Sequence, residues 1–486
     1  MSRLSTATLD GLPTAVERPR YDRAAVRRGV VHLGIGAFHR AHQAVFFDDC
    51  LNAGDLRWGI TAASLRSPAV AEQMNPQDGL YAVLVRDGSD QRARIVGAVC
   101  EVLVAPDDPA ALIAVLASPD THIVTLTITE KGYRLDPATG ALLVDDPQVA
   151  ADIASLAAPR TAPGYLVAAL AARRAVGLAP FTAISCDNLP HNGARLRSAV
   201  LDLAGRHDPA LAAWIAEEGA FPETMVDRIV PATTDADIAA LAERIGVEDR
   251  AMVKTEPFTQ WVIEDRFCGP RPDFGPGVQI TQAVAPWEEA KLRLLNGAHS
   301  GIAYLGGLAG IEHVDQFLKN LDARRFVEGL WDEAETTLSP PPELDIAAYR
   351  RALMARFDNG ALQHRTRQIA MDGSQKLPQR LVAAIVARRA RRQEVAMLAL
   401  AVAAWMRWQG GVDDSGAPFA VDDPMADVTA ARLTGRQSAA ERVDALLSID
   451  AIFPAALRDD VALRAALTGW LTILEEEGAL AALARA

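Results

Sequence analysis

Three polar side chains lie within the segment KLRLLNGAHSG, which spans residues 291–301. Lys291, Asn296 and His299 interrupt an apolar helical pattern. On an α-helix they would fall at about 0°, 140° and 80° around the axis, on one broad face. Packing alone would favour alanine or leucine here, because inside a helix glycine costs about 1 kcal/mol and asparagine about 0.7 kcal/mol relative to alanine. The segment therefore predicts a small polar pocket on one face of a helix.

These three side chains suit the oxidation of a secondary alcohol. That reaction needs a base for the hydroxyl proton and a donor for the developing alkoxide, while a nicotinamide takes the hydride. A lysine can be the base if burial and nearby positive charge lower its pKa to about 7–8. Asparagine can donate a neutral N–H to the oxyanion, and histidine can hold the substrate hydroxyl.

The neighbours of the trio are small, and Gly297, Ala298, Ser300 and Gly301 would leave room for a ligand against the helix. The alternative interpretation needs no ligand. In it the lysine is a solvated charge, the asparagine a helix cap and the histidine a member of the core. The segment alone does not decide between the two.

A glycine-containing turn is the second candidate site. Residues 29–43, GVVHLGIGAFHRAHQ, run from an apolar strand through Gly34 and Gly36 into a helical pattern. Dinucleotide folds place the pyrophosphate at such a turn, because glycine lets the backbone approach the phosphates at the start of a helix. The third glycine of the GxGxxG pattern is replaced by His39, so an ordinary strand-to-helix turn is the alternative.

The strand that follows, RWGITAASL, leads into Arg66 and Ser67 instead of a carboxylate that would bind the adenosine ribose of NAD. An arginine at this place can accommodate the 2′-phosphate of NADP, so these residues leave NAD against NADP open. His39 and His42 form an HxxH pair, but no third ligand at convincing spacing accompanies them. We therefore predict no metal site.

The order of the sequence patterns predicts two domains. Short β-rich runs, among them ARIVGAVCEVLV, alternate with helical patterns over about the first 200 residues, which is typical of a parallel sheet covered by helices. A proline- and glycine-rich stretch at 268–286 separates them from a succession of helical patterns. We expect an α/β fold with a Rossmann-type N-terminal domain at 1–285 and a mostly α-helical C-terminal domain at 286–486.

Composition and charge exclude several classes of protein. The net charge of −13 argues against a nucleic-acid or anionic-membrane surface, and the apolar runs are too short to span a membrane. Four cysteines without a CxxC pair indicate neither a disulfide framework nor a zinc site. We expect a cytoplasmic protein with a small-molecule partner, and the sequence leaves its oligomeric state open.

Seven motifs resemble those of a known family. GIGAFHRAHQ, TITEKGY, SCDNLPHNG, MVDRIVPATT, EPFTQWVIED, KLRLLNGAHS and DGSQKLPQR occur in the order found in the polyol-specific long-chain dehydrogenases, which include mannitol 2-dehydrogenase and fructuronate reductase. The resemblance spans roughly residues 25–430 and includes the signature Lys-x5-Asn-x2-His. It implies a Rossmann-type domain, a helical domain and metal-independent hydride transfer, with a preference for NAD as cofactor.

The resemblance also implies roles for the catalytic residues. Lys291 would be the general acid/base, and His299 would orient the substrate. Asn296 and Asn188 would stabilise the oxyanion together. Asn188 follows the apolar strand FTAIS, and open α/β sheets bind ligands at the carboxyl ends of their strands. A simple turn residue is the alternative for Asn188.

Further positions match the substrate and cofactor sites of that family. Asp227 and Lys376 match positions that line the substrate site. Asp227 could instead be a buried partner of Arg228 or a helix cap, and Lys376 could be a surface charge. A second cation near Lys291 would help to lower its pKa. The cofactor loop would contain Gly34, Gly36, Phe38 and Arg40.

Two substrate pairs follow from the resemblance. D-mannitol and D-fructose are the leading pair, with the polyol and the keto sugar as the small-molecule partners. The alternative is D-mannonate and D-fructuronate, for which Arg365 or Arg367 of HRTRQ would bind the carboxylate. A non-catalytic nucleotide sensor is a remote third possibility, because a fold does not guarantee an activity.

Overall fold

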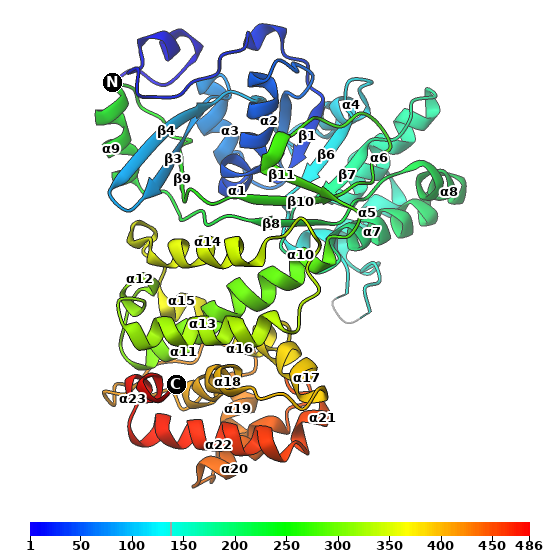
Figure 1. Cartoon of the computed structure of the whole chain (residues 1–486). Coiled ribbons are helices and arrows are strands. Elements are labelled where there is room, and N and C mark those ends of the chain that lie inside the picture. Colours follow the sequence, from blue (N-terminus) through cyan, green and yellow to red (C-terminus); the bar gives the residue numbers. More distant parts are fainter. Residues whose placement is uncertain (137–138) are drawn as a thin grey trace. The chain divides into compact units, whose positions relative to one another are not determined.

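The computed structural model describes residues 1–136 and 139–486, and it divides into two compact units, Met1–Val284 and Ala285–Ala486. The division falls one residue before the boundary expected from the sequence. The named strands of the described chain lie in the first unit, and the second unit is built of helices (Figure 1). The predicted fold class, a Rossmann-type domain followed by a helical domain, is confirmed. No described helix combines the length and the apolar character needed to cross a membrane.

A five-stranded parallel sheet forms the centre of the first unit. Its strand order is β5-β2-β1-β6-β7, and each neighbouring pair is parallel. Most of its residues are buried, as expected for short apolar strands that are covered on both faces. In this spatial order the strands span Val99–Val104, Ile60–Ser64, Val30–Leu33, Ile123–Leu126 and Thr182–Ser185.

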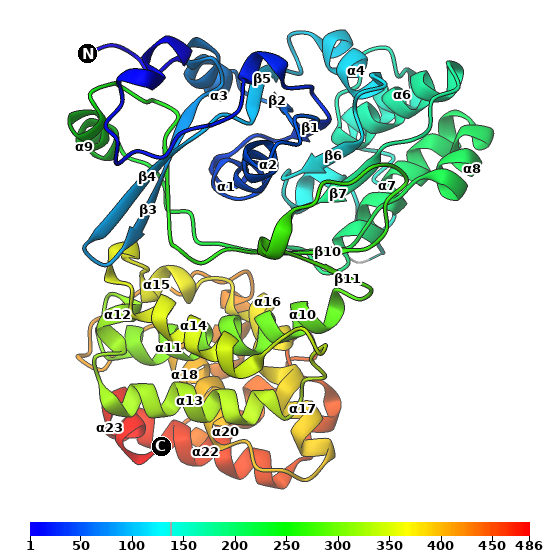
Figure 2. The same cartoon turned by 45° about the horizontal axis from the view of Figure 1, so that its top comes forward.

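Helices cover both faces of this sheet (Figure 2). Successive residues of a strand point to opposite faces, and in β1 Val30 joins the core cluster that contains Phe47, whereas Val31 joins the cluster that contains Leu166. The first cluster includes residues of α2 (Gln43–Asn52) and α3 (Ala69–Met74). The second includes residues of α4 (Pro109–Ala117), α6 (Ala162–Ala175), α7 (Asn192–His207) and α8 (Pro209–Glu218). The remaining helices of the unit are α1 (Ala37–Ala41), α5 (Pro147–Ala154) and α9 (Asp235–Ile245).

The run ARIVGAVCEVLV contains parts of two strands, although its single pattern suggested one. Its first part belongs to β4 (Asp90–Val96), which forms an antiparallel hairpin with β3 (Tyr81–Asp87), and its second part is β5 of the parallel sheet. Gly88, at a φ of +57°, makes the hairpin turn possible. The remaining strands are β8 (Thr224–Asp227), β9 (Val253–Thr255), β10 (Gln260–Glu264) and β11 (Val278–Thr281), which complete two small sheets in the orders β4-β3-β9 and β11-β10-β8.

The second unit is organised around α11 (Gly297–Leu308), in which every residue is buried. It directly follows α10 (Ala285–Ala290) and a π-helix, η6 (Lys291–Asn296). A second π-helix, η8 (Pro378–Val382), joins α16 (Gly373–Leu377) to α17 (Ala383–Ala390). The longer helices around them are α13 (Leu321–Glu335), α14 (Ile346–Asp358), α18 (Ala396–Trp408), α20 (Ala439–Leu447) and α22 (Val461–Glu476). Shorter helices are α12 (Val314–Phe317), α15 (Thr366–Ile369), α19 (Ala426–Leu433), α21 (Ala455–Arg458) and α23 (Ala479–Arg485).

The glycines of α11 allow close packing of helices. A Cβ atom on Gly301 would lie 2.8 Å from the Phe326 ring, and one on Gly297 would lie 2.9 Å from the Arg380 carbonyl oxygen. The expectation that these two glycines leave room for a ligand is therefore wrong. They let α13 and η8 approach the central helix more closely than alanine would permit.

We predict opposite effects for two glycine-to-alanine substitutions in helices. Gly301→Ala should lower the free energy of unfolding by about 1–3 kcal/mol, because the added methyl group overpacks the contact with Phe326. Gly469→Ala is the control, because Gly469 lies in the middle of α22 and a Cβ atom there would meet no other atom within 4 Å. It should raise the free energy by about 0.5–1 kcal/mol through helix propensity. Chemical denaturation measures both, and a neutral Gly301→Ala would contradict the packing role.

Candidate active site

The glycine turn after β1 has the backbone geometry of a dinucleotide cradle. Gly34 has a φ of +91°, and a Cβ atom there would lie 2.3 Å from the Thr127 carbonyl oxygen. Gly36 precedes α1, and a Cβ atom there would meet only the Gly34 oxygen, at 3.9 Å. The first glycine is therefore required by the fold, whereas the second leaves the space beside the turn open. Such a cradle fits a nicotinamide dinucleotide.

A hollow of about 640 Å³ lies beside this turn, at the carboxyl ends of β1, β2 and β6. Its size is in the ordinary range of cofactor pockets. Open α/β sheets bind their ligands at this edge. Its lining includes Gly34 and Ile35, the segments 64–67 and 127–129, and Gly132, Arg134, Gln148 and Arg160.

Phe38 and Arg40, two of the predicted cofactor-binding residues, do not line this hollow. Phe38 stacks on His42, with ring centroids 4.9 Å apart. Arg40 is buried, and its Nε and Nη1 atoms lack a hydrogen-bond partner among the described residues. Burial lowers the pKa of Arg40, but a guanidinium stays protonated in proteins. Two unpartnered cationic donors in the helix after the glycine turn are compatible with an anionic group of a cofactor.

A buried histidine is hydrogen-bonded to the threonine that holds the glycine turn. The Thr127 hydroxyl donates to the Gly34 carbonyl oxygen at 2.9 Å, and His32 Nε2 lies 3.1 Å from that hydroxyl. Nε2 must therefore carry the proton, and Nδ1 accepts from the Thr125 hydroxyl at 2.8 Å. Burial lowers the pKa of His32 to about 3, so its imidazole is neutral near pH 7. The two histidines of the HxxH pair contact other parts of the protein. The His39 ring stacks on the His32 ring with centroids 3.4 Å apart, and His42 Nε2 donates to the Gln260 carbonyl oxygen at 2.9 Å.

A buried carboxylate joins the ends of β6 and β7. Asp187 accepts hydrogen bonds from the backbone N–H groups of Ile128 and Thr129 at 3.1 and 2.9 Å, and from the Tyr133 hydroxyl at 2.6 Å. Thr129 has a φ of +64°, which is strained for a β-branched residue, and such strain is typical of functional sites. Asn188 is the next residue after this clamp and is exposed. Tyr133 and Asp187 lie in the motifs TITEKGY and SCDNLPHNG, but neither residue was predicted from the sequence to have a role.

Asp227 is the last residue of β8, where it pairs with Gln260 of β10 and is buried. The Asn192 side chain connects this strand to the end of β7, because its amide donates to the carbonyl oxygens of Thr224 and Asp187 at 2.9 and 3.0 Å. The first unit therefore holds the loop that carries Asn188 against the start of the strand that carries Asp227.

The segment with the lysine, asparagine and histidine is a π-helix followed by an α-helix, so the α-helical angles assumed for it are wrong. Lys291 and Asn296 begin and end η6, and His299 lies in the first turn of α11. Their exposed fractions are 6%, 9% and 7%. π-Helical turns are rare and occur frequently at functional sites. The interpretation of Lys291 as a solvated helix charge does not agree with this burial.

His299 lies in a basic and aromatic environment. Its ring centroid is 4.9 Å from that of Phe357 and 5.1 Å from that of His364. Burial lowers the pKa of His299 well below its ordinary value, and His364, Arg356 and Arg380 lower it further. Burial likewise lowers the pKa of His364, to about 4. Both imidazoles are therefore neutral near pH 7, and a neutral ring can donate or accept a hydrogen bond to a hydroxyl group.

Arg380, which also lowers the pKa of His299, was not predicted from the sequence to belong to the site. Its Nη1 atom donates to the Ser300 hydroxyl at 3.3 Å, and its Nε atom is buried without a hydrogen-bond partner in the described chain. Burial lowers its pKa to about 10. Its place in η8, opposite Gly297, brings it beside α11, and only the packing of the two helices could show this.

The other predicted substrate-binding residues in this unit differ in their surroundings. Lys376 is half-buried, and burial together with Arg380 lowers its pKa. Its amine donates to the Met371 carbonyl oxygen and lies 3.6 Å from the Asp372 carboxylate. The Arg365 side chain is 65% exposed and pairs with Glu312 at 3.4 Å. Its placement does not favour a role in a buried substrate site.

Arg367, the second arginine of HRTRQ, is also engaged at the surface. Its side chain is 55% exposed, lies 3.6 Å from the Asp413 carboxylate and covers the Phe419 ring at 5.0 Å. The arginines that act on His299 are instead Arg356 and Arg380.

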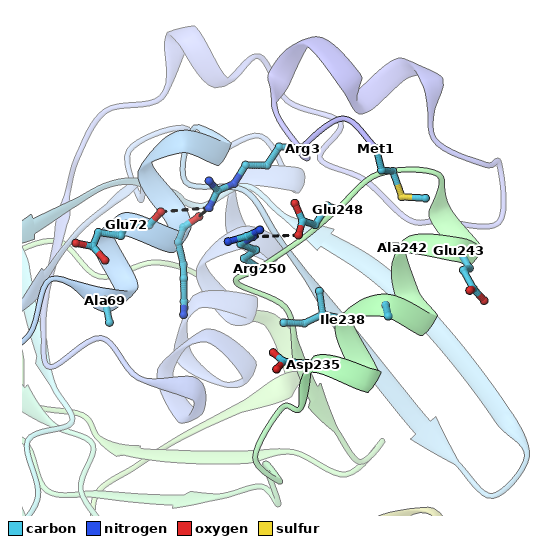
Figure 3. Close-up of a pocket in the computed structure, with 12 residues that line it drawn as sticks. Met1, Arg3, Ala69, Glu72, Asp235, Ile238, Ala242, Glu243, Glu248 and Arg250 are labelled. Atoms are coloured by element: carbon cyan, nitrogen blue, oxygen red, sulfur yellow. Dashed lines mark hydrogen bonds and ion pairs between the residues drawn. The ribbon is translucent and has the colours of Figure 1, made fainter.

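A larger hollow of about 890 Å³ lies elsewhere in the first unit (Figure 3). Several of its charged side chains are engaged with the protein, because Arg250 pairs with Glu248 at 3.0 Å and Arg3 donates to the carbonyl oxygens of Glu72 and Gln73. None of the predicted site residues lines it. The first unit therefore has one candidate site, at the glycine-turn edge, and the second unit has another, on the η6–α11 segment.

Comparisons with known proteins cover almost the whole chain. Residues 28–275 match the mannitol dehydrogenase Rossmann domain, and residues 283–473 match the mannitol dehydrogenase C-terminal domain. The D-mannonate oxidoreductase of Escherichia coli K12 is 42% identical over 98% of this chain and 99% of its own length. The mannitol 2-dehydrogenase of Pyrenophora tritici-repentis is 41% identical over 99% of this chain and 85% of its own length.

Two solved structures share the fold over the full chain. The Pseudomonas fluorescens mannitol 2-dehydrogenase, in a ternary complex with NAD and D-mannitol, is 37% identical with a TM-score of 0.82, and the match covers 99% of each chain. A D-sorbitol dehydrogenase in substrate-free form is 32% identical with a TM-score of 0.93, and the match covers 99% of this chain and 100% of the other.

The neutral state of His32 predicts a loss of stability in acid. The unfolded chain binds a proton below about pH 6.5, whereas the folded chain keeps His32 neutral down to about pH 3. The free energy of unfolding should therefore fall by about 1.4 kcal/mol per pH unit for this one histidine below pH 6. Chemical denaturation at pH 6 and pH 5 measures the slope. In a His32→Asn variant the slope of the free energy against pH should be smaller by about 1.4 kcal/mol per pH unit, which corresponds to one proton. Equal slopes in the two proteins would contradict a neutral His32 in the folded chain.

The Asp187 clamp predicts a local effect of Tyr133→Phe. Loss of the hydroxyl removes its hydrogen bond to the buried Asp187 carboxylate and its contact with the Ser185 hydroxyl, and should cost about 1–3 kcal/mol of local stability. Amide hydrogen exchange at Ile128 and Thr129 should then accelerate, as seen by mass spectrometry of the segment 126–133. The matched control is Tyr21→Phe, which removes a 2.6 Å hydrogen bond to the buried carboxylate of Asp48. Equal acceleration at 126–133 in both variants would show a global effect and contradict the clamp.

Proposed function

The chain belongs to the mannitol dehydrogenase family, and we propose that within this family it interconverts D-mannitol and D-fructose with a nicotinamide dinucleotide as the hydride carrier. The observation that carries the proposal is the burial of Lys291, Asn296 and His299 on one helical segment. Burying an ammonium group is costly, so a buried lysine is more readily explained by a chemical role than by packing. The relative solved with NAD and D-mannitol, which matches along the whole chain, supports the same pair.

In the proposed mechanism Lys291 Nζ accepts the proton of the substrate hydroxyl during oxidation and returns it during reduction. The neutral His299 ring holds the same hydroxyl in place, because burial and the neighbouring arginines keep the imidazole uncharged. The side-chain amides of Asn296 and Asn188 donate to the oxygen as negative charge develops on it. A bound nicotinamide dinucleotide would supply the acceptor for the hydride of the carbinol carbon.

The glycine turn, with Gly34 and Gly36, would hold the pyrophosphate of that dinucleotide. Asp227 and Lys376 remain our proposed substrate contacts at the other hydroxyl groups. Lys376 has a second proposed effect, because a half-buried cation would favour the neutral form of a lysine base close to it.

D-mannonate and D-fructuronate are the second candidate pair. A specific observation favours them, because Arg380 acts on His299 and its Nε atom is buried without a hydrogen-bond partner in the described chain. Arginine binds carboxylates in a bidentate manner, and a substrate carboxylate would give this guanidinium a partner. The D-mannonate oxidoreductase of E. coli is 42% identical, so sequence similarity does not separate the two candidates.

Absorbance at 340 nm tests the choice directly. Purified protein is mixed with NADH or NADPH and with D-fructose or D-fructuronate. We expect turnover of D-fructose. A preference for D-fructuronate would instead support D-mannonate and D-fructuronate as the substrate pair. Turnover of neither substrate, with dinucleotide bound, would contradict both pairs.

We predict that Lys291→Ala lowers kcat by about 10²–10⁴-fold, the range of a lost general base, while dinucleotide binding remains. Lys319→Ala is the matched control, because its side chain is 75% exposed and pairs only weakly with Asp315, at 3.9 Å. The rate of polyol oxidation should rise towards alkaline pH in the wild type, since the base must be deprotonated. Unchanged turnover in Lys291→Ala, or a flat pH profile with chemistry limiting the rate, would contradict the assignment.

A further inference from the structure

We propose that Tyr133 and Asp187 are positioning residues for the reaction, because together they fix the turn that carries Asn188 to the wall of the hollow beside the glycine turn. Both residues would act through Asn188 and not on the substrate itself. The inference rests on the proposed function for one point, namely that the Asn188 side chain donates to the substrate oxygen as negative charge develops on it.

The position of the Asp187 carboxylate is the first argument. β6 and β7 are parallel neighbours, so the chain leaves both strands at the same edge of the sheet. Across this edge the two carboxylate oxygens accept separate hydrogen bonds, Oδ2 from the Ile128 N–H at 3.1 Å and Oδ1 from the Thr129 N–H at 2.9 Å. Two bonds to one planar group leave it little freedom to rotate. The residue before Asn188 is therefore fixed to the segment that follows β6.

Tyr133 supplies the third donor to the same carboxylate. Its buried hydroxyl donates to Asp187 Oδ2 at 2.6 Å, so in their contact the Ser185 hydroxyl donates to the Tyr133 oxygen. The hydrogen bonds run in one direction, from Ser185 through Tyr133 to the carboxylate. Burial raises the pKa of Asp187, whereas the three donors lower it. Loss of one donor would therefore weaken the charged form that the other two bind.

The backbone of Asp187 is held as well as its side chain. Its carbonyl oxygen accepts from the Asn192 side-chain amide at 3.0 Å and from the Leu189 N–H at 2.9 Å. The second bond joins residues two apart and closes a tight turn with Asn188 at its middle position. Asn188 is exposed, so its side chain can meet a ligand while the turn that carries it is fixed.

The segment that Asp187 binds also forms part of the wall of the hollow. Residues 127–129 and Gly132 line it. Thr129 has a φ of +64°, which is unfavourable for a β-branched residue, and its N–H is one of the donors to Asp187. Strained backbone persists only where its surroundings hold it. One buried carboxylate thus joins the residue before Asn188 to the wall beside which we propose that the dinucleotide binds.

A double-mutant cycle on the full-length protein tests the inference. Tyr133→Phe, Asn188→Ala and the double variant are compared with the wild type in the reduction of D-fructose or D-fructuronate, whichever the wild type prefers. NADH or NADPH and the sugar are saturating, so weaker binding appears in KM and not in kcat. We expect Asn188→Ala to lower kcat by about 100- to 1,000-fold, the range of a lost oxyanion donor. Tyr133→Phe should lower it by about 10- to 100-fold, the cost of a displaced group.

The double variant separates positioning from a general loss of stability. If Tyr133 acts through Asn188, the double variant should keep the kcat of Asn188→Ala within about twofold. Tyr21→Phe is the matched control, because it removes a 2.6 Å hydrogen bond to the buried Asp48 carboxylate in the same unit. Alone or combined with Asn188→Ala, it should change kcat by less than about twofold.

Ser185→Ala is a second variant that carries the cycle if Tyr133→Phe does not fold. It keeps the bond between Tyr133 and Asp187 and removes only the hydroxyl that donates to Tyr133. It should lower kcat less than Tyr133→Phe, and it should have no further effect in the Asn188→Ala background.

A double variant whose kcat falls by the product of the two single effects would overturn the inference and leave the proposed function intact. An unchanged kcat in Tyr133→Phe, or an equal loss in Tyr21→Phe, would overturn it in the same way. An unchanged kcat in Asn188→Ala would overturn the role of Asn188 in the proposed function and this inference with it. Turnover of neither sugar by the wild type would overturn both.

Discussion

The contact between the Gly34 turn and the end of β6 determines the geometry of the first unit. Because Gly34 has no side chain, its backbone lies against the Thr127 carbonyl, and β1 can turn at the level where β6 ends. The Thr127 hydroxyl holds the same turn through a hydrogen bond, and His32 supports that hydroxyl from the core. The candidate cofactor hollow and the Asp187 clamp lie on segments that leave the sheet at this edge. A side chain at Gly34 would separate the strand ends and disturb all of them.

The central helix of the second unit, α11, has no face exposed to solvent. Every residue of α11 is buried, so a polar group on it needs a partner in the protein or in a ligand. His299 meets this requirement as a neutral ring among aromatic and basic neighbours. The glycines of α11 let α13 and η8 pack closely against it. The segment that carries the three polar side chains is therefore closely packed, with Gly297 against η8 and Gly301 against Phe326 of α13.

Local charge in both units opposes the charge of the whole chain. The net charge of −13 argued against a nucleic-acid surface, yet the charged side chains in the described lining of the glycine-turn hollow are arginines, and two arginines lower the pKa of His299. The net charge governs long-range attraction, whereas binding of a small anion depends on charges within a few ångströms. For this reason the two basic regions could be recognised only when their residues were placed in space.

The sequence by itself determined the fold class, the glycine turn and the seven motifs, because apolar runs, strand-to-helix turns and motif order are properties of neighbouring residues. Only the tertiary structure decided the rest. The apolar spacing of 291–296 suits an α-helix as well as a π-helix, and ARIVGAVCEVLV contains two strands of different sheets because a hairpin pairs its first half elsewhere. Arg365 and Arg367 precede the DGSQK motif closely but pair with carboxylates at the surface, whereas Arg380 is half-buried and donates to Ser300. Side chains distant along the chain acquire their environment from the packing of whole elements, and that packing is not encoded in any single local pattern.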